Sequence, residues 1–179
     1  MKTYSSAAQG LKLLFLAEII AIAAAVLSLV PFVGMILYIV GLVLVLVGLY
    51  KAGADDEGYK TAFIISIVNL VAGVISGFTG GVIGTILSIV STVLELLVVY
   101  YVVNTTSNLA RSRGNSELPA KGEKVWKLYL ACTVINVIVS LLSFIPILAA
   151  VLTIVLLVVQ IIAYILYLLF LNGAPKTLE

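Results

Sequence analysis

The sequence predicts an all-α polytopic membrane protein with six transmembrane helices, arranged as three tandem helical hairpins. Hydrophobic residues make up 63% of the chain and charged residues 10%, whereas a soluble domain has roughly a quarter charged residues. The apolar residues form three long blocks, each long enough for two helices that cross a bilayer at ~20 residues apiece. Each block also has Gly or Pro near its middle, which favours a tight reversal of the chain.

The elements follow from these blocks in order along the chain. The blocks cover 13–50, 61–110 and 128–175, and charge interrupts them only at Glu18 and Glu95. The turns are expected at 30–34, 78–81 and 144–146. Six spans are therefore predicted, at 11–30, 33–52, 60–78, 82–104, 125–144 and 147–171. The alternative is hairpins that enter one leaflet and return, but each arm is long enough to span.

These spans define a single transmembrane domain, residues 1–179. Its repeats cover 11–52, 60–104 and 125–171, and a polar cytoplasmic linker at 111–124 precedes the third. All ten Lys and Arg residues lie in the termini and in the two longer loops. By the positive-inside rule, the protein is expected in the cell membrane with both termini cytoplasmic. An aromatic belt is expected at the same interface, formed by Tyr50, Tyr59, Tyr100, Tyr101, Trp126, Tyr129 and Tyr167.

The three blocks align as repeats when Lys12, Lys60 and Lys127 are placed in register. Small or polar residues then recur in steps of three and four, which places them on one face of each first helix. We therefore expect a pseudo-threefold bundle about the membrane normal. The stripes are Glu18, Ala21, Ala25 and Ser28; Ser66, Asn69, Gly73 and Ser76; and Thr133, Asn136, Ser140 and Ser143.

Such stripes have two interpretations. Small and polar residues allow membrane helices to pack closely, and we regard packing as the main role of these stripes. The alternative is that they line a passage or a ligand pocket between the hairpins. An axial cavity surrounded by the stripes would favour this alternative, whereas interlocked stripes would count against it.

The candidate intramembrane polar site consists of Glu18, Glu95, Gln160, Asn69 and Asn136. An ionisable group at membrane depth costs ~2 kcal/mol or more and usually faces protein or water. Glu18 and Glu95 each lie about 10 Å from the cytoplasmic boundary, in a layer that also includes Gln160. Two carboxyls in one layer disfavour double ionisation unless a cation lies between them. Alternatively, each Glu is neutral and hydrogen-bonded to a neighbouring helix, or reaches toward Lys12 and the interface.

Other classes of site have little support. His is absent and Cys132 is the only cysteine, so the usual zinc, haem and iron–sulfur ligand sets are missing. We expect no metal, no cofactor and no catalytic residue, because no nucleophile motif is present. No basic face indicates a nucleic-acid partner. The acidic run 55–57 is expected to be a solvated loop, with a divalent-ion site as the alternative.

The leading hypothesis is a non-enzymatic membrane protein that associates laterally with lipid, with its own copies or with another membrane protein. The alternative is a small channel or transporter for a proton, cation or small solute that uses Glu18 and Glu95. The sequence supports no expectation for Leu178 and Glu179, which follow the last apolar block.

Overall fold

Helices account for nearly all of the computed structural model, which describes residues 3–30, 32–79, 81–141 and 146–179. No strand occurs in these residues. Outside the described residues are Pro31, Gly80 and residues 142–145. They include parts of the three expected turns and Ser143 of the third stripe. The helices are α1 (Ser5–Val26) with a short 3-10 extension η1 (Leu27–Leu29), α2 (Val33–Ala52), α3 (Glu57–Phe78), α4 (Gly81–Ser112), α5 (Glu117–Leu141) and α6 (Pro146–Leu178).

Five stretches of these helices are long and apolar enough to cross a membrane. They lie in α1 with η1, α2, α3, α4 and α6, and they make the chain a multi-pass membrane protein. The sixth predicted span, 125–144 in α5, extends into residues that are not described. Large apolar side chains cover the outer surface, and Leu29, Phe78 and Val82 are 91%, 88% and 77% exposed. Lipid is the solvent that suits such a surface.

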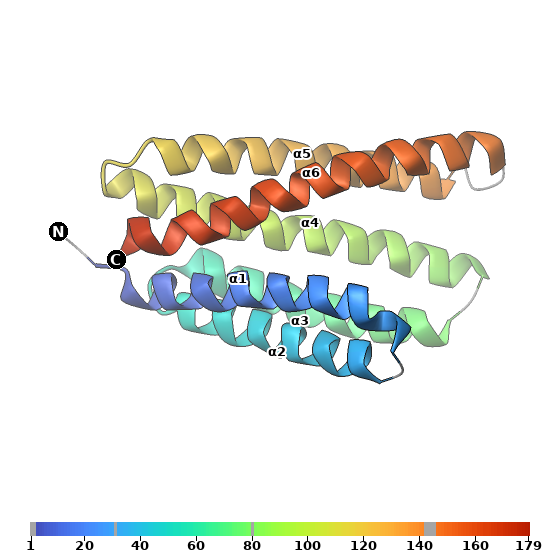
Figure 1. Ribbon diagram of the computed structural model, residues 1–179, viewed down its shortest axis with the longest axis horizontal. Helices are drawn as coiled ribbons and strands as arrows, with labels where there is room; N and C mark the ends of the chain where they lie inside the picture. Colours follow the sequence, from blue (N-terminus) through green and yellow to red (C-terminus); the bar gives the residue numbers. More distant parts are fainter. Residues whose placement is uncertain (1–2, 31, 80, 142–145) are drawn as a thin grey trace.

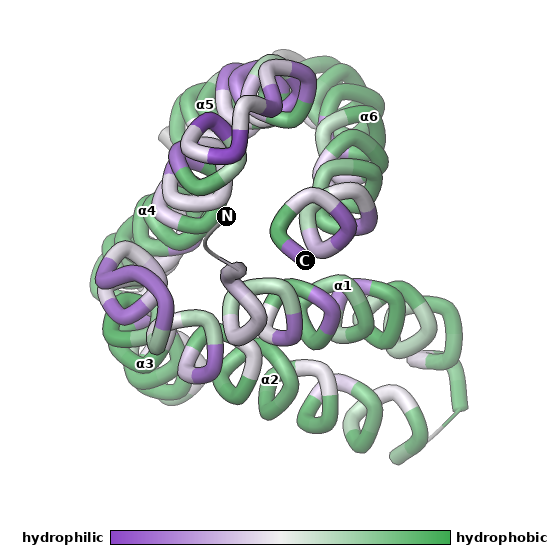
Figure 2. Tube along the Cα trace, turned by 90° about the vertical axis from the view of Figure 1, so that its left-hand side faces the viewer, coloured by the Kyte–Doolittle hydropathy of each residue, from purple (hydrophilic) through white to green (hydrophobic). Residues whose placement is uncertain are grey.

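Consecutive helices run in opposite directions, and both termini lie at one end of the bundle (Figure 1). We call this the loop end, because it also holds residues 53–56 and 113–116, and we call the opposite end the turn end. Each helix packs against the next along the chain, and α6 packs against α1. Viewed from the loop end, the helices therefore form a ring (Figure 2).

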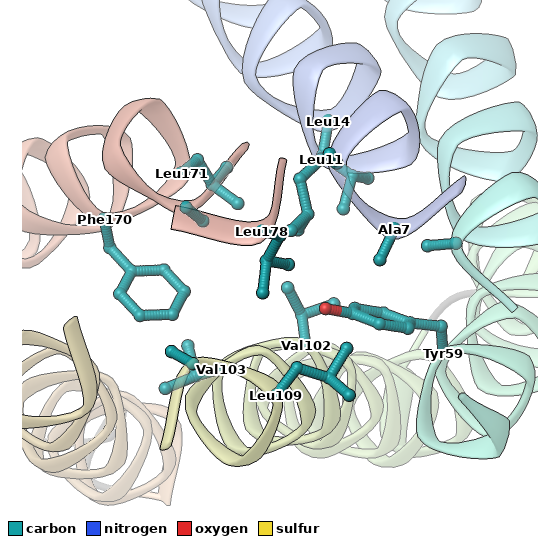
Figure 3. Packing of buried hydrophobic residues seen from close by; sticks show 14 of the residues in the cluster. Ala7, Leu11, Leu14, Tyr59, Val102, Val103, Leu109, Phe170, Leu171 and Leu178 are labelled. Carbon is teal, nitrogen blue, oxygen red and sulfur yellow. The ribbon is translucent and has the colours of Figure 1, made fainter. Parts of the chain in front are cut away.

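The main hydrophobic core lies entirely in the loop-end halves of the helices (Figure 3). Leu11, Tyr59, Val102 and Leu178 are fully buried there. Close helix contact is possible because many core positions carry alanine. The alanines with no exposed surface are Ala7, Ala8, Ala52, Ala62, Ala110 and Ala174.

The last turn of α6 closes the ring against α1. Leu178, for which the sequence supported no expectation, points into the core (Figure 3). Its carbonyl oxygen accepts a hydrogen bond of 3.2 Å from the backbone N–H of Tyr4. Glu179 forms an ion pair with Lys12. The C-terminal turn therefore stabilises the loop end as part of the fold.

Within the predicted linker at 111–124, only residues 113–116 lie outside helices. The Asn115 side chain accepts a hydrogen bond of 2.9 Å from the backbone N–H of Leu118 and so caps α5. Lys121 pairs with Glu117, and Lys127 with Glu123, at 2.6 Å and helical spacing. Hydrogen bonds from these lysines hold the pKa of both carboxyls below their usual range. Capping and charge pairing thus extend the helix beyond the apolar residues.

The acidic loop 55–57 also has a structural role. Asp55 accepts a hydrogen bond of 2.7 Å from the backbone N–H of Ala7, in the first turn of α1. Asp56 accepts one of 2.8 Å from Gly58 and caps α3. Free N–H groups at a helix start need such partners. These two carboxylates therefore hold the starts of α1 and α3 together.

Helices α1 and α2 make their closest approach at two glycines. A Cβ atom on Gly10 would overlap the carbonyl oxygen of Gly48 and lie 2.7 Å from the Cβ of Ala52. A Cβ on Gly48 would lie 2.8 Å from the carbonyl oxygen of Gly10. The two backbones are therefore in direct contact, as small residues permit inside lipid.

We expect Gly10→Ala to lower the free energy of unfolding by about 1–3 kcal/mol, because the added methyl group forces α1 and α2 apart. Thermal unfolding in detergent would measure this as a lower melting temperature. Gly77→Ala is the matched control, since a Cβ there meets nothing within 4 Å. Equal melting temperatures for the two variants would contradict the close contact.

Candidate functional site

Each of the six helices contributes side chains to a central cavity of about 680 Å³ inside the ring. Core residues Leu14, Val102 and Tyr167 bound it toward the loop end. Three of the predicted site residues line it: Glu18 of α1, Asn69 of α3 and Glu95 of α4. The cavity therefore brings together polar groups from the first four helices, far apart in sequence.

A side cavity of about 570 Å³ lies mainly between α4, α5 and α6. The other two predicted site residues, Asn136 and Gln160, line it together with Glu95. Glu95, Tyr129 and Tyr164 line both cavities. These three residues thus form a shared wall, and all five predicted positions face one cavity or the other.

Glu18 has a partner on the helix that closes the ring. The Tyr164 hydroxyl of α6 lies 2.7 Å from Glu18 Oε2 and 2.9 Å from the Glu18 carbonyl oxygen, and it donates to them. Lys12, the alternative partner, is paired with Glu179. The Glu18 carboxyl is therefore held beside the shared wall by a neighbouring helix.

Glu95 is placed differently. It makes no hydrogen bond or ion pair with any residue that the structure describes, and its side chain is exposed because it faces both cavities. Both carboxyls line the same central cavity. Asn69 Oδ1 and Ser91 Oγ, both in the central cavity, are buried without a partner in the described chain. The cavity wall thus offers polar groups that the fold leaves available.

Part of each polar stripe on the first helices lines a cavity, the central one for α1 and α3 and the side one for α5. Ala21 joins Glu18 on α1, Ser66 and Gly73 join Asn69 on α3, and Thr133 joins Asn136 on α5. Several hydroxyls on these helices also bond their own backbone, as Ser66 does with the Ala62 carbonyl. Such bonds satisfy the hydroxyl and need no ligand. The amide and carboxyl groups are therefore the informative members of the stripes.

Sequence reasoning missed Tyr164, the direct partner of Glu18. Its only sequence signal is a position four residues after Gln160, on the same helical face. Tyr129 was expected in the interfacial belt, but it lines both cavities. Tyr167, also expected in the belt, is 4% exposed and packs its ring 5.6 Å from that of Tyr129. Aromatic side chains thus accompany the carboxyls inside the bundle.

The arrangement combines two carboxyls, amide groups and tyrosines in a largely apolar enclosure. Within the described ranges, no group of three or more His, Cys, Asp or Glu could hold a metal ion. Comparisons with protein-family models, curated proteins and solved structures find no match to this chain. The chemistry available is to hold a proton, or to present negative charge to a cationic group.

Tyr164→Phe should reduce stability, because it removes the hydrogen bond between α6 and α1. A loss of about 1 kcal/mol is expected, which lowers the melting temperature in detergent by roughly 2–4 °C for a chain of this size. Tyr38→Phe is the control, since the Tyr38 side chain is 63% exposed and forms no hydrogen bond with a described residue. An unchanged melting temperature for Tyr164→Phe would show that this bond contributes nothing.

Proposed function

We propose that the protein is a small membrane transporter or channel in which Glu18 and Glu95 receive a proton or another cation during its passage. The observation that carries this proposal is that stripe residues of α1 and α3 line a cavity that also contains both acids, Glu18 and Glu95. Interlocked stripes would have favoured a purely structural role. No Lys or Arg is among the residues that line either cavity, so the interior favours positive charge.

The proposal includes a topology. Six spans form three hairpins related by a pseudo-threefold axis, and the loop end faces the cytoplasm. The ring of contacts, in which each helix packs against its neighbours in sequence and α6 against α1, supports this arrangement. So does the position of the Lys and Arg residues, which all belong to the termini and the loop-end segments.

Passage through the bundle requires a conformational step. The core at the loop end separates the central cavity from that side of the membrane, with Tyr59, Val102 and Leu178 fully buried in it. A cation that reaches Glu95 therefore meets a packed apolar barrier. We propose that this barrier opens while the turn-end half closes, so that the acids are reached from one side at a time.

Purified protein in proteoliposomes should dissipate an imposed cation gradient faster than protein-free vesicles. An entrapped pH-sensitive dye reports proton flux, and ion-selective dyes report sodium and potassium flux. Glu95→Gln should reduce the rate to that of empty vesicles, because the amide keeps the shape of the side chain but carries no charge. Glu18→Gln should act in the same direction.

The matched control is Glu57→Gln, which changes an acid of similar shape at the loop end, where the Glu57 side chain is 92% exposed. Its flux should equal that of the wild type. Vesicles that stay impermeable to the whole cation panel, or flux unaffected by both cavity substitutions, would refute the proposal.

A further inference from the structure

The size and composition of the two cavities indicate the kind of cation they suit. The central cavity has a volume of about 680 Å³ and the side cavity about 570 Å³, and the shared wall separates them. Sites for small organic ligands have volumes of this order, are mostly apolar, and contain a few polar groups that fix orientation. A proton relay or a bare metal ion needs no enclosure of this size.

We propose that the site accepts an organic cation with an apolar or aromatic body, an inference that rests on the proposed function. The charged centre would lie at the shared wall, near Glu95 and Glu18. The apolar body would occupy one of the cavities, among residues such as Leu157 and Ile161 in the side cavity or Leu42 and Leu70 in the central one.

The charges around the cavities determine the sign of the charge that the ligand carries. Glu95 has no partner among the described residues, and two carboxyls face a space that no Lys or Arg lines. An anion would be repelled, and a neutral apolar molecule would leave the Glu95 carboxyl without a partner. A cation offsets the cost of an ionised carboxylate at membrane depth. Positive charge is therefore the feature that the cavity selects.

Aromatic rings favour an organic cation over a metal ion. Tyr129 and Tyr164 are shared by both cavities, and Tyr167 lies at the base of the central one. Ring faces attract organic ammonium and related cations, especially where water is excluded. By contrast, a hard metal ion needs several oxygen ligands around a small volume, and the described residues contain no cluster of three or more His, Cys, Asp or Glu that could hold one.

Burial of apolar surface is a separate reason for a ligand with an apolar body. The walls away from the shared residues are mostly apolar, so burial of apolar ligand surface against them contributes about 25 cal/mol per Å². A small, strongly hydrated cation gains nothing from these walls. Affinity should therefore rise with the apolar surface of the cation at constant charge.

The test uses tetraphenylphosphonium, whose charge is permanent, and the full-length protein in lipid nanodiscs. Equilibrium dialysis should give saturable binding above that of empty nanodiscs. Glu95→Gln should weaken it at least about tenfold, which corresponds to ~1.4 kcal/mol, and Glu57→Gln should leave it unchanged. Tetramethylammonium, with the same charge and little apolar surface, should compete poorly. Triphenylphosphine oxide, which is neutral and similar in shape, should not compete.

Several results would overturn this inference. They are the absence of saturable tetraphenylphosphonium binding, equal competition by the neutral oxide, or full binding to both Glu95→Gln and Glu18→Gln. Retained helical circular dichroism shows that a variant is folded, and Glu18→Gln provides a second variant if Glu95→Gln is not. Proton or metal-ion flux without tetraphenylphosphonium binding would refute the organic cation as the ligand but would leave the proposed transport function standing. Failure of both assays would also refute the proposed function.

Discussion

Inside a bilayer, each peptide N–H and C=O must find its partner within the protein, because hydrocarbon offers none. The chain meets this requirement with helices over nearly all of its described length. Side-chain hydroxyls follow the same constraint, since Thr85 and Thr92 both bond carbonyls of their own helix. What remains after this local satisfaction is a small set of carboxyl and amide groups. These are the groups that face the cavities.

The uneven packing of the bundle follows from where its small residues lie. Alanine and glycine dominate the contacts at the loop end, so the helices approach closely there and exclude both water and lipid. Gly10 and Gly48 allow direct backbone contact, and Leu178 fills the space between the helices. Nearer the middle of the bundle, polar stripes face one another across open volume. The tightly packed loop end and the polar cavity nearer the middle of the bundle thus both follow from where the small side chains lie.

The two membrane acids differ because their neighbours differ. Glu18 is oriented by Tyr164 on the helix that closes the ring, whereas Glu95 has no such partner in the described chain and lines both cavities. An unpartnered carboxyl is costly at this depth unless water, a proton or a cation accompanies it. This cost is the physical basis of the proposed cation site. The tyrosines around it extend the preference toward organic cations.

Composition and hydropathy alone indicate the class of protein and the positions of its polar membrane residues. Hydropathy is a local property, so the long apolar blocks and the acids within them, Glu18 and Glu95, are visible without a structure. Helical periodicity likewise places Asn69 and Asn136 on the stripes of their helices. Helix ends were harder to predict from the sequence, because Asn115 and the lysine pairs of α5 continue a helix where composition suggested a linker.

Which side chains meet, by contrast, depends on how the helices pack in three dimensions. Tyr164 and Glu18 are 146 positions apart in the chain, and Asp55 caps a helix that begins 50 residues earlier, at Ser5. No local pattern encodes such pairings, because they depend on how the helices close into a ring. The same closure decides whether polar stripes interlock or enclose space. Here the stripes of α1 and α3 line the central cavity and that of α5 lines the side cavity, while the main hydrophobic core lies at the loop end.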